Sequence, residues 1–187
     1  MNSVTLLNST QVNLALKRLA RQLVENHDDF HNTVFLGLQP RGIQFAERLV
    51  REVEQIIGKP VNFGKIDITF HRDDFRRGEE PLKANRTEIN FLIENRQVIL
   101  IDDVLYTGRS IRAALDAMLS FGRPEKVELC VLVDRRFSRH LPVQPDYVGR
   151  QVDSIQSEKV TVKWSETDGT DEVILFTSKT ANDSTIG

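Results

Sequence analysis

Residues 98–115 read VILIDDVLYTGRSIRAAL. The stretch begins as an unbroken apolar run, continues with two adjacent acids, and passes through a Thr-Gly turn into a helical pattern. Adjacent carboxylates repel each other and resist removal from water. Their position at the end of a buried strand therefore indicates that solvent or a ligand meets them there.

Further apolar runs and helical patterns alternate along the chain around this stretch. Short β-rich runs predict buried strands at 33–38, within 61–70, at 97–101 and at 126–133. Helical spacing predicts helices from an Asn8-Ser9-Thr10 cap through Leu23, over 43–57 and over 109–121. This alternation predicts an α/β fold with a mostly parallel central sheet flanked by helices. Ligands of such sheets bind at the carboxyl ends of strands, where the acids and the sequence QPRG (39–42) fall.

The overall composition is that of an ordinary globular chain. It has 187 residues, of which 40% are hydrophobic and 28% charged, with a formal net charge of −2. That charge predicts no bulk attraction to nucleic acid, so RNA or DNA binding needs a local basic patch. One cysteine, Cys130, supports no disulfide framework, and no 18 apolar residues run together. We expect a cytoplasmic protein without a membrane segment, folded as a single domain over 1–180 with a frayed tail at 181–187.

The stretch HRDDFRRGEEPLKANRTE (71–88) departs from the alternating pattern. It carries many charges of both signs and has no apolar period. Loops of this length in compact domains are often functional, and we expect a solvated lid loop here.

The turn that follows the acids has the features of a phosphate site. Backbone N–H groups at a helix start are unpaired and lie at the positive end of the helix dipole. Gly108 permits close approach, and the hydroxyls of Thr107 and Ser110 add donors. A phosphate beside two carboxylates needs a neutral or cationic group between them, such as a ribose diol with Mg²⁺. The pattern thus favours a sugar phosphate; the alternative is that the acids only end a strand and Thr107 only caps a helix.

The full string VILIDDVLYTGRS resembles the signature with which type I phosphoribosyltransferases bind 5-phosphoribosyl 1-pyrophosphate (PRPP). The segments GLQPRGIQFAERL, IDITFHRDD, GRPEKVELCVLVDR, LPVQPDYVGRQV and SEKV are similar to a subfamily that combines uracil phosphoribosyltransferase activity with regulation of pyrimidine operons. This resemblance covers residues 10 to about 165. It implies the type I fold, with a small hood formed by parts of the N-terminal region and 134–177 and a flexible lid loop over 71–88.

The resemblance implies roles for two groups of residues around PRPP. The PRPP-binding candidates are Pro40, Arg41, Gly42, Asp102, Asp103, Val104, Leu105, Tyr106, Thr107, Gly108, Arg109 and Ser110. Asp102 and Asp103 would take the ribose hydroxyls and hold Mg²⁺ directly or through water, and Arg41 with the 40–42 amides would hold pyrophosphate. Relatives often carry a cis non-proline peptide in that loop, for which the candidate here is Pro40-Arg41.

By resemblance, closing the lid would exclude water from the reacting sugar and bring Arg72 to the pyrophosphate. Arg72 is therefore the third catalytic candidate, with Asp102 and Asp103. Arg76 and Arg77 have the same expected role, with a solvated charge run as the alternative.

The expected reaction transfers the phosphoribosyl group of PRPP to uracil, giving UMP and pyrophosphate. Purine-specific relatives often have an acid at the position of Tyr106, which is a poor base at neutral pH, and a pyrimidine is therefore favoured. The base-binding candidates are Val133, Asp134, Arg135, Tyr147, Val148 and Gly149; Asp134 has a strand-end cap as its alternative. The runner-up functions are transfer to another base and an RNA-binding attenuator with vestigial catalysis.

A basic arc on the first helix suggests a second partner. Lys17, Arg18 and Arg21 lie opposite its apolar face. In the subfamily that the chain resembles, this region of the protein contributes to RNA contact, so pyrimidine-leader RNA is an expected partner. The alternative is an ordinary solvent-facing surface. The segment DRRFSRHLP (134–142) is one residue longer than is usual for the subfamily and lacks its glycine, which places RNA attenuation in question. By resemblance the protein would be a homodimer or a dimer of dimers.

Overall fold

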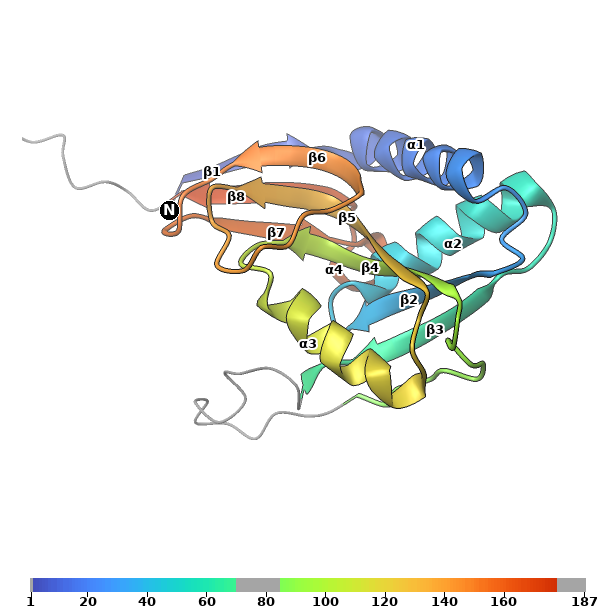
Figure 1. The fold of residues 1–187 in the computed structure, drawn as a ribbon. Coiled ribbons are helices and arrows are strands. Elements are labelled where there is room, and N and C mark those ends of the chain that lie inside the picture. Colours follow the sequence, from blue (N-terminus) through green and yellow to red (C-terminus); the bar gives the residue numbers. More distant parts are fainter. Residues whose placement is uncertain (1, 70–84, 178–187) are drawn as a thin grey trace, which may run out of the picture.

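The computed structural model of the chain describes residues 2–69 and 85–177. Its centre is a five-stranded sheet with strand order β3-β2-β4-β5-β6, in which every pairing is parallel (Figure 1). The strands are β2 (Thr33–Gln39), β3 (Asn62–Asp67), β4 (Gln97–Leu105), β5 (Lys126–Arg136) and β6 (Tyr147–Asp153). Parallel pairing brings the carboxyl ends of these strands to one edge of the sheet. The predicted α/β fold is confirmed.

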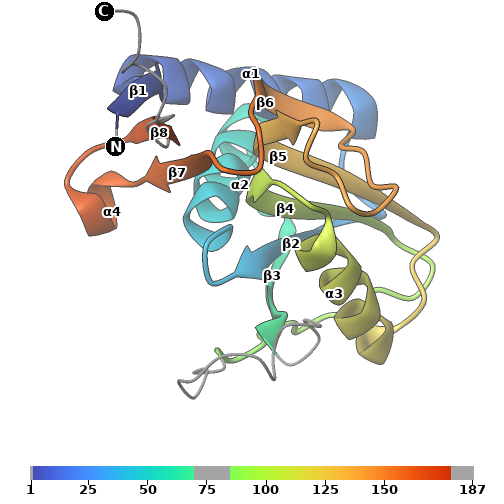
Figure 2. The same ribbon diagram turned by 90° about the vertical axis from the view of Figure 1, so that its left-hand side faces the viewer.

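Helices cover both faces of this sheet. Helices α1 (Ser9–His27) and α2 (Ile43–Ile57) pack on one side, and α3 (Arg109–Met118), extended by a short 3-10 helix (Leu119–Phe121), packs on the other (Figure 2). The Asn8 side chain accepts a hydrogen bond from Gln11 N at 3.0 Å, and the Gln11 side chain accepts one from Asn8 N at 3.0 Å. This reciprocal capping box starts α1 at the predicted place. Within the described ranges, no helix is long and apolar enough to cross a bilayer.

A second, smaller sheet lies beside the central one. It is antiparallel, has the order β1-β8-β7, and consists of β1 (Asn2–Leu7), β7 (Lys159–Lys163) and β8 (Glu172–Thr177). The short helix α4 (Ser165–Asp168) joins β7 to β8. Strand β7 contacts the central strand β4. The first residues and the last third of the chain thus meet near the carboxyl edge of the central sheet (Figures 1 and 2).

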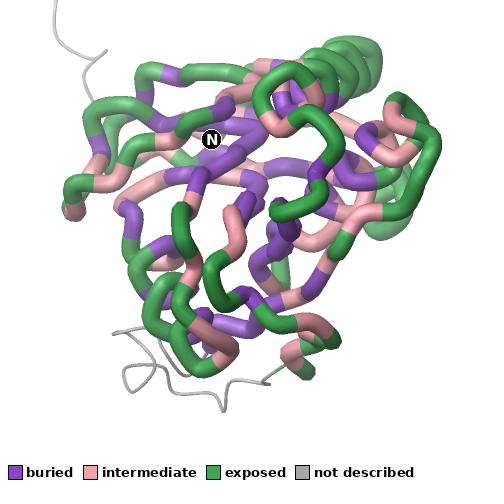
Figure 3. Tube along the Cα trace, turned by 45° about the vertical axis from the view of Figure 1, so that its right-hand side comes forward, coloured by how far each residue is buried: buried purple, intermediate pink, exposed green. Residues whose placement is uncertain are grey.

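The core consists of two apolar layers, one on each face of the central sheet. Side chains of α1, α2 and the second sheet fill one layer, and side chains of α3 fill the other. Buried segments accordingly run through the interior of the trace, and the turns outside them are exposed (Figure 3). Cys130 is fully buried in β5, and this burial raises the pKa of its thiol, so the cysteine acts as a small apolar side chain.

One arginine joins α2 to the second sheet. Arg48 donates to Asp171 at 2.8 Å and to Glu166 at 2.5 Å, and its guanidinium carbon lies 4.8 Å from the centroid of the Trp164 ring. The hydrogen bonds from Arg48 hold the pKa values of Asp171 and Glu166 below their usual range. Trp164 itself is buried and stacks on Phe45 of α2. This cluster fixes the second sheet to the helix layer.

The Arg48 cluster gives a stability prediction. Arg48→Met removes the charge-assisted bonds and the stacking on Trp164, and we expect the free energy of unfolding at pH 7 to fall by about 2 kcal/mol. Because the pKa values of Asp171 and Glu166 are depressed, their contribution is present above about pH 4 and is lost as the pH falls below it. Urea unfolding at pH 7 and pH 3 measures both effects. Arg51→Met, at an exposed position of the same helix, is the control, and an equal loss in both variants would contradict this account.

Candidate active site

A cavity of about 390 Å³ opens at the carboxyl edge of the central sheet. The carboxyl ends of β2 and β4 and the turns after them form one side of it, and the loop before β7 together with β7 itself forms the other. Its lining residues are Leu38, Gln39, Pro40, Arg41, Ile68, Asp102, Asp103, Val104, Tyr106, Ser110, Arg135, Gln156, Glu158, Lys159, Val160 and Val162. The predicted edge is therefore hollow, and the acids lie in its wall.

Asp102 and Asp103 are almost buried, although both line this cavity. Their exposed fractions are 8% and 7%, and both lie inside β4, which continues to Leu105 rather than ending before the acids. The side chain of Asp102 accepts a hydrogen bond from Asp103 N at 3.0 Å. Burial raises the pKa of Asp103, against which hydrogen bonding to Asp102 and the charge of Arg41 act. Such a partly desolvated pair favours hydroxyl donors or a cation.

The turn after β2 lies directly against the acid pair. A Cβ placed on Gly42 would lie 2.8 Å from Asp102 Oδ1 and 2.9 Å from Leu38 O, so only glycine fits there without displacement. Arg41 is exposed beside it and lines the cavity. The expected position of the cis bond is wrong: among the described residues the cis peptide is Gln39-Pro40, one residue before Pro40-Arg41. The tertiary amide before proline makes the cis form far less costly than it is elsewhere.

The turn after β4 presents a helix start without a side-chain cap. Gly108 is the N-cap of α3, has a φ of +90°, and makes no capping side-chain bond. The hydroxyl of Thr107 accepts from Arg109 N only at 3.4 Å. The first N–H groups of α3 therefore remain suited to an anion. Ser110 lines the cavity beside them.

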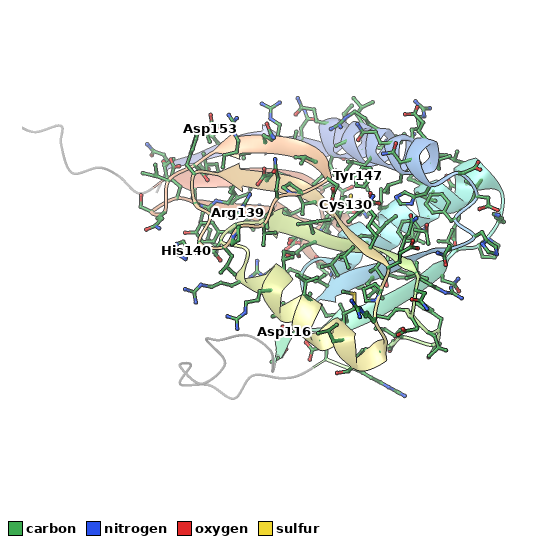
Figure 4. The ribbon with its side chains drawn as sticks, in the orientation of Figure 1. Asp116, Cys130, Arg139, His140, Tyr147 and Asp153 are labelled. Atoms are coloured by element: carbon green, nitrogen blue, oxygen red, sulfur yellow. The ribbon has the colours of Figure 1, made fainter. Side chains whose placement is uncertain are left out.

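The segment 137–143 packs against this turn. The guanidinium of Arg139 binds both the carboxylate of Asp134 and the backbone carbonyl of Tyr106. The backbone N–H groups of His140 and Leu141 both donate to Thr107 O, at 3.0 and 3.2 Å. Arg139 and His140 lie near the start of α3 in Figure 4. The unusual DRRFSRHLP sequence thus supports the 106–110 turn, a role that the sequence patterns did not predict.

The structure separates the six base-binding candidates. Arg135 lines the cavity and its guanidinium carbon lies 3.9 Å from the centroid of the Tyr106 ring. Val133 is fully buried in β5, and Asp134 is bound to Arg139. Both therefore support the site from behind the lining residues.

The other three candidates, Tyr147, Val148 and Gly149, begin β6 and do not line the described cavity. The Tyr147 hydroxyl accepts from Asn26 Nδ2 at 3.1 Å and lies 3.2 Å from His27 Nε2, because its ring is packed under α1. Tyr147 and Arg139 lie far apart along the sheet in Figure 4. The structure thus does not bring this group together with Arg135.

Several lining residues have no counterpart among the sequence candidates. They are Leu38, Gln39, Ile68, Gln156, Glu158, Lys159, Val160 and Val162. The segment SEKV contributes to the resemblance, but no local pattern predicts that it faces the acids. Arg72, Arg76, Arg77 and most of the expected lid lie outside the described residues.

The carboxylates of the site can be compared with the ligands that Mg²⁺ usually has in proteins. In the described part of the chain, no group of three or more His, Cys, Asp or Glu residues could hold a metal. The protein therefore offers Asp102 and Asp103, with further ligands left to water and substrate. Mg²⁺ is often bound in this way, through one or two carboxylates and phosphate oxygens, so the residues fit the ion.

The basic arc of α1 forms one side of a separate surface groove. Lys17, Arg18, Arg21 and Arg150 line it, and all four are exposed. Arg18 also donates to Val148 O and Gly149 O, the latter at 2.6 Å. The structure thus gives Arg18 a role in fixing α1 to β6.

Comparison with known proteins agrees with this geometry. The family model described as "Phosphoribosyl transferase domain" matches residues 3–167. The chain is 47% identical over 167 residues to "Bifunctional protein PyrR" of Desulfosudis oleivorans, covering 89% of this chain and 92% of that one. It is 41% identical over 174 residues to the protein of the same name from Bacillus subtilis, covering 91% and 95%.

Solved structures show the same fold at lower identity. A hypoxanthine phosphoribosyltransferase of Staphylococcus aureus superimposes with a TM-score of 0.69 at 20% identity, over 96% of this chain and 98% of that one. A hypoxanthine-guanine enzyme of Leishmania tarentolae, solved in complex with GMP, gives 0.69 at 19% identity, over 95% and 97%. The fold, the family match and the identity to curated relatives agree: the chain belongs to the phosphoribosyl transferase domain family and, within it, to the PyrR proteins.

Proposed function

We propose that this protein transfers the phosphoribosyl group of PRPP to uracil, giving UMP and pyrophosphate. One observation carries the proposal: a single cavity brings together a nearly buried acid pair, the Gly42 turn and the start of α3 without a side-chain cap. These are respectively a hydroxyl acceptor, a close backbone approach and an anion site. PRPP carries a diol, a 5-phosphate and a pyrophosphate on one ribose.

Each part of the cavity has a role in the reaction. Asp102 and Asp103 accept hydrogen bonds from the ribose hydroxyls, and the N–H groups of the 107–110 turn hold the 5-phosphate. Arg41 and the backbone of 40–42 hold the pyrophosphate. The bond between C1 of the ribose and the pyrophosphate oxygen breaks, and its electron pair leaves with pyrophosphate. The bond between C1 and N1 of uracil forms, and the N1 proton passes to water. Mg²⁺, when bound, neutralises charge on the pyrophosphate and the acids.

The choice of base rests on the residues beside the reacting carbon. Tyr106 lies where a purine enzyme would place an acid, and Arg135, Lys159 and Val160 also line the cavity. A phenol does not take up a proton from a purine at neutral pH. Turnover of PRPP measured with uracil, orotate, hypoxanthine and guanine tests the assignment, and a faster reaction with another base would replace uracil.

Replacing Asp103 by Asn tests the acid pair. The substitution keeps the shape but removes a charged acceptor, and we expect turnover with uracil to fall at least about tenfold. The ligand-free variant should be more stable than the parent at pH 8. Burial raises the pKa of Asp103, so the parent loses stability as the pH rises from the ordinary Asp pKa through the raised one, a loss that Asn lacks.

The two readouts separate function from folding. Thermal unfolding should show that the Asn variant is more stable than the parent at pH 8, and that this difference in stability is smaller at pH 4. Parental kinetics in the variant would contradict the role of Asp103 in binding the diol. Asp116→Asn, on the exposed face of α3, is the control for a general effect of removing a carboxylate.

A second proposed activity is binding of pyrimidine-leader RNA through the α1 groove. It is favoured by the cluster of Lys17, Arg18, Arg21 and Arg150 in a chain whose net charge is −2. Such a local patch can hold phosphates although the whole chain does not attract them. If RNA binds tightly while uracil turnover is negligible, the protein is an RNA-binding attenuator with vestigial catalysis.

Replacing Lys17 and Arg21 together by Gln measures how much these two charges contribute to RNA binding. We expect weaker leader-RNA binding and a log–log salt slope reduced by up to about 2, because each residue contacts a phosphate. Uracil turnover should stay the same, since the groove lies away from the cavity. Arg51→Gln in α2 with Lys59→Gln just beyond the end of that helix, two exposed positions, is the matched control. An unaltered slope, or no binding by the parent at physiological salt, would contradict this activity.

Assembly and location stay predictions. We propose a homodimer or a dimer of dimers in the cytoplasm, and light scattering of the purified protein tests the assembly.

A further inference from the structure

Two consecutive arginines end β5, and they have opposite environments. Arg135 is 4% exposed and lines the cavity. Arg136 has a 45% exposed side chain and pairs with Asp153 on the surface. A buried guanidinium requires several acceptors to offset its lost hydration. Its partners therefore show what Arg135 holds in place.

The hydrogen bonds of Arg135 go to one loop. It donates to Ser154 Oγ at 2.8 Å, to Ile155 O at 3.0 Å and to Glu158 O at 2.9 Å. Glu158 in turn accepts from Ile155 N at 2.9 Å, which closes the loop on itself. This 154–158 loop leads into β7 and contributes Gln156 and Glu158 to the cavity wall. Arg135 thus fixes the wall opposite the acid pair.

The flat face of the same guanidinium contacts the other side of the cavity. Its carbon lies 3.9 Å from the centroid of the Tyr106 ring, well within the range of a cation–π interaction. Tyr106 is the first residue of the 106–110 turn, whose residues 107–110 are proposed to hold the 5-phosphate. One side chain therefore bridges the two walls between which the substrate must lie.

A second connection runs in parallel. Gln156 Nε2 lies 3.2 Å from His140 Nε2, and His140 N donates to Thr107 O at 3.0 Å. Ser138 Oγ also donates to Ser154 O at 3.0 Å. The 154–158 loop is thus joined to the 106–110 turn both directly, through Arg135, and by way of the 137–143 segment. A shift of either wall would break bonds in both connections.

We propose that Arg135 is a positioning residue that couples the base-side wall, the 154–158 loop, to the phosphate-holding turn through the Tyr106 ring. The proposal rests on the proposed function and deepens it. It assigns Arg135 a role in setting the separation of the two walls, so that base and sugar phosphate are bound as one unit. Because all three described hydrogen bonds of its guanidinium go to the 154–158 loop, this role does not require contact with the base.

Lysine is the informative replacement for Arg135. It keeps the positive charge, but its ammonium is a compact group without a planar fork or a flat face for stacking. Arg135→Lys therefore loses the geometry and not the charge. Tyr106→Leu removes the stacking surface from the other side, and Tyr106→Phe retains it. Arg136→Lys is the matched control at the adjacent, exposed position.

The experiment compares two ligands by isothermal titration calorimetry. UMP occupies the phosphate turn, the acid pair and the base side, whereas ribose 5-phosphate occupies the turn and the acid pair but leaves the base side empty. The dissociation constant of ribose 5-phosphate divided by that of UMP measures how much the base adds to binding. We expect Arg135→Lys and Tyr106→Leu to lower this ratio at least about fivefold, because each breaks the bridge between the walls. Tyr106→Phe should keep more of the ratio than Tyr106→Leu, and Arg136→Lys should keep the parental value.

The outcomes separate positioning from folding and from the proposed function. A variant that is merely less stable has a lower unfolding temperature, but its folded fraction gives the parental ratio of the two dissociation constants. Steady-state kinetics should agree, with KM for uracil raised more than KM for PRPP in Arg135→Lys. If the parent distinguishes the two ligands and both Arg135→Lys and Tyr106→Leu do so equally well, the coupling is overturned. If the parent binds UMP and ribose 5-phosphate equally, both the coupling and the assignment of the base are overturned.

Discussion

The close approach of Gly42 to Asp102 is the constraint on which the site depends. Strands β2 and β4 are parallel neighbours, so the turn after one meets the acids at the end of the other. A side chain at residue 42 would displace either the turn or the carboxylate, since its Cβ would lie 2.8 Å from Asp102 Oδ1. The missing side chain lets the 40–42 turn and the two carboxylates line one cavity.

The rest of the molecule holds the facing wall in place. Arg48 fixes the second sheet to α2, while Arg135 and Arg139 fix the 154–158 loop and the 106–110 turn to the end of β5. Each of the three arginines makes hydrogen bonds to two or more oxygens at once, which the planar guanidinium does better than an ammonium. The cavity is therefore shaped by long-range polar contacts laid over an apolar α/β core.

Much of the fold could be predicted from the sequence, and the reasons are local. The helices α1, α2 and α3 carry long periodic patterns with clear ends, such as the Asn8 cap and Gly58. The inner strands are unbroken apolar runs. The strands β1, β6, β7 and β8 are short or lie at sheet edges, and their pairing partners are distant in sequence; β1 pairs with β8. The acids and their turn could be found because they form one contiguous motif. Arg139, Gln156 and the Gln39-Pro40 cis bond depend on tertiary contacts that no local pattern encodes.

The bonds from Arg18 to Val148 O and Gly149 O have a consequence for self-association. Strand β6 is the last strand of the central sheet, and such a border offers backbone groups to which a strand of another molecule can add. The guanidinium of Arg18 donates to the carbonyls of Val148 and Gly149 near the start of this strand, from within the same chain. A long, charged side chain therefore competes with any incoming strand at the start of β6. The same residue that fixes α1 to the sheet also discourages the growth of the sheet into a polymer.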